Sequence, residues 1–381
     1  MIRIELLGSA LVFGAAGLSQ ACPLSDEARA LLQRSMEKSR NVPLIAILYQ
    51  KSVGGPSAAM QVKVEQSKGG QTKVTILKPL SMAGVTSVDN GRQWHTYLPD
   101  QNRMIVQESP RRNGQSVQGR LDLAEQNYVF KMEQDVTIAG RRAACISALP
   151  RVKNMPTRRY YVDKETAILL RLETVEGADT QVQFDTKLIQ YPKETSKASF
   201  EMKFFGDKPR RIDCPAPTKI ASANQAKPSL GFSPIIPVKL PMGFVVQEPQ
   251  VAGGSEFRFA AIRLTDGLVN GTVYQWRGEK DDLPTAFKPQ KGDKLAKGVW
   301  FRFVGDVPND AKDQLLDLFL REAAKHLKML SEPAAPPPAL KGVRNDLMGT
   351  ILLSIEMAAA EAQTSNAGMC GYSRGAATLE P

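Results

Sequence analysis

The spacing most suggestive of catalysis lies near the end of the chain, at residues 371–375 (GYSRG). This G-x-S-x-G pattern, in hydrolases, places a nucleophilic serine on a sharp turn between a buried strand and a helix. Here the surrounding sequence is glycine-rich, and both histidines, His95 and His326, precede Ser373. The order serine, acid, histidine of those hydrolases is therefore impossible. We interpret the match as chance, and an esterase that uses Ser373 is the least favoured hypothesis.

Other motifs of catalysis or cofactor binding do not occur in the sequence. It contains no phosphate loop, dinucleotide fingerprint, C-x-x-C or paired metal-ligand spacing. The sequence therefore predicts a non-enzymatic protein with no cofactor and no metal site. Cys145 and Cys214 are positioned to close a structural disulfide, and a chain with no bridge between them is equally compatible with the sequence.

The length and charge favour a two-domain protein with a basic surface. A chain of 381 residues is long for one core, and its formal net charge is +11. The four Arg-Arg pairs are scattered along the chain, and no nucleic-acid-binding motif accompanies them. We therefore expect no nucleic acid partner. The charges indicate a solvated surface first, and peripheral contact with an anionic membrane or an acidic protein second.

Residues 1–21 have the pattern of a secretory signal peptide. The apolar run from Leu6 to Leu18 is too short to span a bilayer, and residues 19–21 (SQA) resemble a cleavage site before Cys22. Export to the periplasm is expected. Acylation of Cys22, as in a lipoprotein, is a minor alternative, because Gln20 stands where that signal prefers a small residue.

Residues 23–205 are expected to form one domain, with an amphipathic helix followed by a long series of strands. Leu31, Leu32 and Met36 recur at helical spacing, and Pro43 ends the helix. Alternating segments separated by turn residues then continue to Gln190. This order predicts an α+β fold that is mainly antiparallel, with a strongly curved sheet wrapped over the helix as a half-barrel.

Apolar residues on these elements are candidates for a lipid cavity between sheet and helix, although each is also a plausible core residue. They are Leu32, Met36, Trp94, Leu98, Met104, Val106, Val182 and Phe184.

Residues 206–230 are rich in Pro, Ala, Ser and Lys and are predicted to be a linker. Residues 231–330 then form a smaller domain. Its centre is residues 257–276, where alternation on both sides of a Thr-Asp-Gly turn predicts a β-hairpin. A helix from about Asp310 to Leu330 closes this domain. Residues 331–342 read as a Pro/Ala linker and 343–381 as a helical extension with a flexible tail.

Several motifs resemble the MucB/RseB family of periplasmic sigma-factor regulators, whose large domain is a LolA/LolB-like lipoprotein-carrier half-barrel. The first domain contributes LLQRSMEKSRNVPLIAILYQ, DNGRQWHTYLPDQNRMIV and RRYYVDKETAILLRLETVEG. The second contributes LPMGF, LTDGLVNGTVYQW and FVGDVPNDAKDQLLDLFL, in the family's order. Together they cover roughly residues 24–330.

The resemblance implies a protein that binds the periplasmic segment of a single-span anti-sigma factor and shields it from proteolysis. Lipid or lipopolysaccharide acyl chains in the half-barrel would trigger release of that partner. The partner-binding residues expected on the hairpin are Arg263, Asp266, Tyr274 and Trp276. The alternative is a periplasmic carrier of lipid or lipoprotein without a signalling partner.

Overall fold

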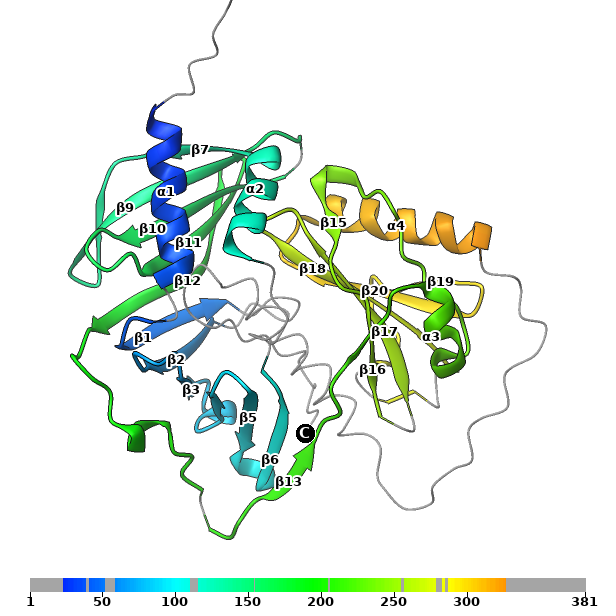
Figure 1. Cartoon of the computed structure of the whole chain (residues 1–381), viewed down its shortest axis with the longest axis horizontal. Helices are drawn as coiled ribbons and strands as arrows, with labels where there is room; N and C mark the ends of the chain where they lie inside the picture. Colours follow the sequence, from blue (N-terminus) through cyan, green and yellow to red (C-terminus); the bar gives the residue numbers. More distant parts are fainter. Residues whose placement is uncertain are drawn as a thin grey trace, which may run out of the picture.

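The computed structural model describes residues 23–38, 41–51, 59–109, 116–153, 155–204, 206–254, 257–278, 283–284 and 287–326. Figure 1 shows a large curved sheet with two helices beside a smaller sheet with a long helix. The predicted signal peptide, Cys22 and the predicted extension with Ser373 lie outside the described residues.

The large sheet has 13 strands in the order β13-β6-β5-β4-β3-β2-β1-β12-β11-β10-β9-β7, with β8 also paired to β9. Its strands are β1 Leu44–Lys51, β2 Ala59–Gln66, β3 Thr72–Lys78, β4 Thr86–Asp89, β5 Gln93–Leu98, β6 Arg103–Glu108, β7 Tyr128–Met132, β8 Val136–Ile138, β9 Arg141–Pro150, β10 Thr157–Asp163, β11 Leu169–Glu176, β12 Asp179–Gln190 and β13 Arg210–Asp213. Neighbouring strands are antiparallel except β13 and β6, which are parallel. The sheet ends at β13 and β7 and does not close into a barrel.

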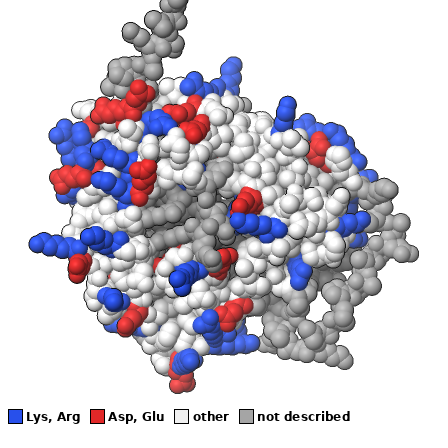
Figure 2. All heavy atoms as spheres, viewed as in Figure 1, with Lys and Arg blue, Asp and Glu red and all other residues white. Residues whose placement is uncertain are grey.

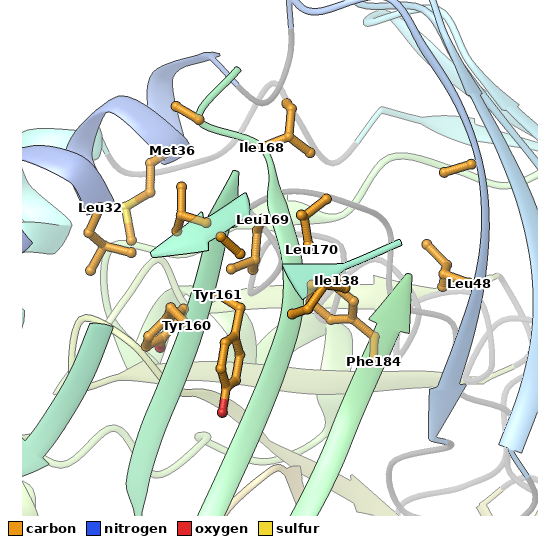
Figure 3. Close-up of a cluster of buried hydrophobic side chains, with 14 of the residues drawn as sticks. Leu32, Met36, Leu48, Ile138, Tyr160, Tyr161, Ile168, Leu169, Leu170 and Phe184 are labelled. Atoms are coloured by element: carbon orange, nitrogen blue, oxygen red, sulfur yellow. The ribbon is translucent and has the colours of Figure 1, made fainter. Parts of the chain in front are cut away.

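Two helices cover the inner face of this sheet. They are α1 (Pro23–Lys38) and α2 (Val117–Asn127). Ala28, Leu32 and Met36 recur every fourth residue on α1 and are buried. Figure 3 shows Leu32 and Met36 at one side of the apolar cluster that they form with residues of the strands. Burial of such a side chain stabilises the fold by about 1.5–3 kcal/mol, so this helix face fixes α1 on the sheet.

The smaller sheet has seven antiparallel strands in the order β14-β16-β17-β18-β20-β19, with β15 also paired to β17. Its strands are β14 Thr218–Lys219, β15 Val245–Val246, β16 Gln250–Gly253, β17 Arg258–Thr265, β18 Asn270–Arg277, β19 Lys294–Ala296 and β20 Val299–Gly305. Its helices are α3 (Ala223–Leu230) and α4 (Asn309–His326). None of the described helices is long and apolar enough to cross a membrane.

Both faces of the smaller sheet are covered. On one face, Leu315, Leu316 and Phe319 of α4 pack with residues of β17, β18 and β20. On the other, an aromatic cluster contains Phe259, Tyr274, Trp276 and Phe287. The predicted fold class is therefore confirmed: a curved half-barrel over a helix, followed by a smaller antiparallel sheet with a C-terminal helix.

The segment predicted as a linker, residues 206–230, is largely folded onto the two sheets. β13 joins the large sheet beside β6, β14 joins the small sheet beside β16, and α3 packs against β17. Only residues 214–217 (CPAP) separate β13 from β14.

Candidate functional site at the domain junction

The tip of the β17–β18 hairpin lies directly against α2 of the first domain (Figure 1). At this tip Gly267 has a φ of +101°, and a Cβ built on it would lie 2.4 Å from the backbone nitrogen of Ala124. Such a contact is too close for any side chain, so glycine is required both by the backbone conformation and by the approach to the helix. Next to it, Leu268 packs into the core of the first domain. The hairpin is therefore the main point of contact between the domains.

Asp266 is the polar centre of this contact and is 1% exposed. Its Oδ1 accepts hydrogen bonds from the backbone nitrogens of Leu268 (2.9 Å) and Val269 (2.7 Å), which shapes the turn. Its Oδ2 accepts a hydrogen bond of 2.6 Å from the hydroxyl of Tyr128, on β7 of the first domain. One carboxylate thus organises the hairpin and binds it to the neighbouring domain.

A second contact brings the loop before β15 to the same place. The Nδ2 of Asn127 donates to the backbone oxygens of Asp266 (2.9 Å) and Gly243 (3.1 Å). Gly243 has a φ of +74°, and a Cβ there would lie 1.8 Å from the Oδ1 of Asn127. Arg120 on α2 also donates to the backbone oxygen of Gly267, at 3.4 Å.

The third contact is an ion pair between β10 and the loop before α4. The guanidinium of Arg158 donates to the backbone oxygen of Asp306 (2.8 Å) and to its Oδ2 (2.7 Å). Arg158 is 4% exposed, so this charge is almost entirely removed from water. Beside it, an open polar pocket of about 370 Å³ has walls from both domains, including Thr174, Glu176 and Asp310.

The three contacting loops are the three sequence blocks that distinguish the second domain. LPMGF supplies Gly243, LTDGL supplies Asp266 and Gly267, and VGDVP supplies Asp306. These short motifs, widely separated in the sequence, therefore share one location and one role: they meet the first domain.

Burial sets the electrostatics of the junction. Burial raises the pKa of Asp266, and the hydrogen bonds from Tyr128, Val269 and Leu268 offset only part of this effect. Burial, together with the Asp266 charge, also raises the pKa of the Tyr128 hydroxyl far above its usual range. Tyr128 is therefore a hydrogen-bond donor at every physiological pH.

The structure places three of the four predicted partner-binding residues of the hairpin in the interior. Asp266, Tyr274 and Trp276 are at most 1% exposed, and Arg263 is half-buried. Asp266 is covered by the first domain. Tyr274 and Trp276 lie on β18, a central strand, as members of the aromatic cluster, and Arg302 lies over the Trp276 ring. In this conformation the hairpin contacts the chain's own first domain, and these three side chains are covered.

The structure places the predicted lipid-cavity residues on more than one face of the large sheet. Of the eight, Leu32, Met36, Leu98 and Phe184 belong to the apolar core beneath α1 and α2. Figure 3 shows Phe184 opposite Leu32 and Met36 across this cluster. None of the eight lines the junction pocket.

The register of β5 and β6 explains why Met104 and Val106 are misplaced in that prediction. Tyr97 pairs with Met104 and His95 with Val106, whereas Thr96 pairs with Ile105. Because paired residues share a face of the sheet, Met104 and Val106 lie on the face opposite to Trp94 and Leu98. Val182, which is 42% exposed, also lies outside the core.

The predicted disulfide is not formed: Cys145 and Cys214 are not bonded to each other. Cys145 is buried in β9, near one end of the strand order, and Cys214 follows β13 at the other end. Burial raises the pKa of the Cys145 thiol to about 11, so this thiol is protonated and unreactive at neutral pH.

The polar residues of the first domain at the junction were not predicted from the sequence. Arg158 belongs to an Arg-Arg pair interpreted as solvated, and Asn127 and Tyr128 lie where a helix meets a strand. The sequence signal for this junction was Asp266-Gly267. An aspartate followed by glycine marks a tight turn, and a glycine lets the backbone approach another segment closely.

Comparison with known proteins identifies the first domain. Residues 29–199 match the family model of the MucB/RseB N-terminal domain. The crystal structure of MucB in complex with MucA(peri) is 14% identical, with a TM-score of 0.50 over 76% of this chain and 96% of that chain. The Pseudomonas aeruginosa MucA/MucB complex has the same identity and coverage and a TM-score of 0.49. A LolA superfamily protein from Nitrosomonas europaea is 13% identical, with a TM-score of 0.23 over 46% of this chain and 97% of that chain.

No curated protein matches the chain. At 14% identity, the likeness to the MucB complex shows a shared fold. With the family match over the first domain, it confirms the resemblance predicted from the sequence.

The raised pKa of Asp266 predicts a specific pH dependence. Its neutral form contributes stability below the unfolded pKa of about 3.9, and this contribution is lost as pH rises through the higher folded value. Asp266→Asn, neutral at every pH, should therefore be at least as stable as the wild type at pH 7, with the difference shrinking toward pH 3. Asp266→Ala should instead cost about 1–3 kcal/mol for each buried donor left without its acceptor. Urea unfolding across this pH range measures both.

Asp163 is the matched control, a buried aspartate of opposite behaviour. Burial alone would raise its pKa, but hydrogen bonds from Arg141 and from the backbone of Glu165 and Thr166 lower it overall. Its stabilising contribution is present above the unfolded pKa and is lost as pH falls, so Asp163→Asn should lose stability at pH 7. Equal losses of unfolding free energy at pH 7 in Asp266→Asn and Asp163→Asn would contradict the opposite pKa shifts assigned to these two residues.

Proposed function

We propose that this chain is an exported, non-enzymatic regulator of a membrane anti-sigma factor, because residues 29–199 match the MucB/RseB N-terminal domain. It binds the periplasmic segment of that factor and shields it from proteolysis. The family match is the observation that carries the proposal. The periplasmic location follows from the same match and from the signal-like residues 1–21.

The two-domain architecture supports a regulator over a simple carrier. The fold shared with the MucB complex extends over 76% of this chain and 96% of that one, and so includes the second domain. In that crystal structure MucB is bound to MucA(peri). A carrier of lipid or lipoprotein has no evident need of a second domain held against the first by three separate loops.

In the same proposal, binding of lipid is the signal that releases the anti-sigma factor. The interior of the half-barrel is apolar and the sheet does not close between β13 and β7, and acyl chains are proposed to enter this interior. A ligand that binds one conformation better than another shifts the population toward the first, which is how bound lipid would release the partner. Leu32, Met36, Leu98 and Phe184 are the residues on the correct face for this role.

The net charge supports contact with anionic headgroups, and the face seen in Figure 2 is mixed in charge. Figure 2 shows Lys and Arg side chains intermingled with Asp and Glu on the face viewed. The formal net charge of +11 attracts anionic surfaces at long range, and salt screens this attraction over about 8 Å at physiological ionic strength. Peripheral contact with a membrane is therefore expected to weaken as salt rises.

Bound lipid is tested by native mass spectrometry of protein purified from membranes. The wild type should carry acyl species. Leu98→Trp, which fills the interior, should reduce the bound fraction. Val182→Trp, the same new side chain on the exposed face of β12, should not. Wild-type protein free of lipid, or equal occupancy in the two variants, would overturn the lipid part of the proposal.

The regulatory partner is tested by affinity purification of the tagged mature chain from its own envelope. We expect recovery of a single-span anti-sigma protein, because its periplasmic segment is the proposed ligand. An unrelated single-span protein of equal abundance serves as the control. Recovery of lipoproteins alone would refute the regulator and support the carrier.

A further inference from the structure

We propose that the domain junction is a releasable latch: polar donors of the first domain hold acceptor loops of the second, and the second domain swings away about residues 215–217. The inference concerns two conformations of this chain and depends on neither the proposed partner nor the proposed lipid.

The hydrogen bonds of the junction described above all run in one direction. The donors lie on the first domain, in α2, β7 and β10, and the acceptors lie on three loops of the second. The donors are Arg120, Asn127, Tyr128 and Arg158, and the acceptors are Gly243, Asp266, Gly267 and Asp306. One of these contacts, Arg158 with Asp306, is an ion pair, and Arg120 adds a second positive charge on the donor side.

Contacts of this kind release more easily than an apolar core does. When the domains part, water hydrates Arg158, Asp306 and Asp266 and recovers the desolvation cost that each group carries when buried. Part of this cost is not offset in the docked state, because the Nε of Arg158 is buried without a hydrogen-bond partner among the described residues. Release would therefore relieve a desolvation cost that the docked contacts leave uncompensated.

The apolar part of the junction is small. Leu268 is the residue of the hairpin tip that joins the first core, and Val152 and Met155 reach the second core in return. The open pocket of about 370 Å³ beside Asp306 leaves part of the interface polar and accessible. Interfaces between domains with little apolar area permit relative motion.

The connection between the domains has the form of a short hinge. The backbone nitrogen of Cys214 donates to Val106 on the first sheet (2.8 Å), and that of Ile220 donates to Pro249 on the second domain (3.0 Å). Between these anchors lies the sequence Pro215-Ala216-Pro217, where each proline fixes its own φ. The motion is therefore confined to a few backbone angles.

The test combines hydrogen exchange with small-angle X-ray scattering on the full chain. The double variant Tyr128→Phe/Asp306→Ala removes the hydrogen bond from Tyr128 to Asp266 and the ion pair of Arg158 with the Asp306 side chain, and it leaves the backbone contacts of Asn127 and Arg158 in place. Exchange at residues 265–269 should accelerate about tenfold or more, as expected for the loss of a hydrogen bond to a charged group. The radius of gyration should increase, while the exchange of β17, β18 and the core strands of the large sheet stays unchanged.

Tyr161→Phe is the matched control, because the Tyr161 hydroxyl donates a comparable hydrogen bond of 2.7 Å to Glu173 within the first domain. It should change neither the exchange of the hairpin tip nor the radius of gyration. The latch is refuted if the folded double variant matches the wild type in both measurements. It is equally refuted if the tip opens only together with global unfolding, because the junction is then a fused core.

Discussion

The carboxylate of Asp266, buried beneath the first domain, is the constraint on which this arrangement depends. It shapes the hairpin turn through two backbone hydrogen bonds and receives a third from Tyr128. The turn in turn requires Gly267, since no larger residue fits against the backbone of α2. The same turn therefore stabilises the second domain and fixes how that domain packs against the first.

Much of the fold could be predicted from the sequence, because it depends on local periodicity. The four-residue spacing of Ala28, Leu32 and Met36 and the alternation along the strands gave the helix, the curved sheet and the smaller sheet. The order of motifs also led to the MucB/RseB family, which the match over residues 29–199 confirms. These properties need only the residues that lie near one another in the chain.

The site could not be predicted to the same degree, because it depends on what covers each face. Alternation along β18 indicated that Tyr274 and Trp276 share a face, but not that an aromatic cluster covers it. Similarly, alternation along β5 and β6 did not determine their register. That register places Met104 and Trp94 on opposite faces of the sheet. Arg158 looked like surface charge because its partner, Asp306, lies 148 residues further along the chain.

The function that we propose is shielding of the periplasmic segment of an anti-sigma factor from proteolysis. The direct measurement is the rate at which a protease cuts that purified segment, alone and with increasing amounts of the mature chain. Shielding predicts saturable protection at one chain per segment, and no protection of an unrelated peptide cut by the same protease. An unchanged rate of cleavage at saturating concentrations of the chain would contradict it.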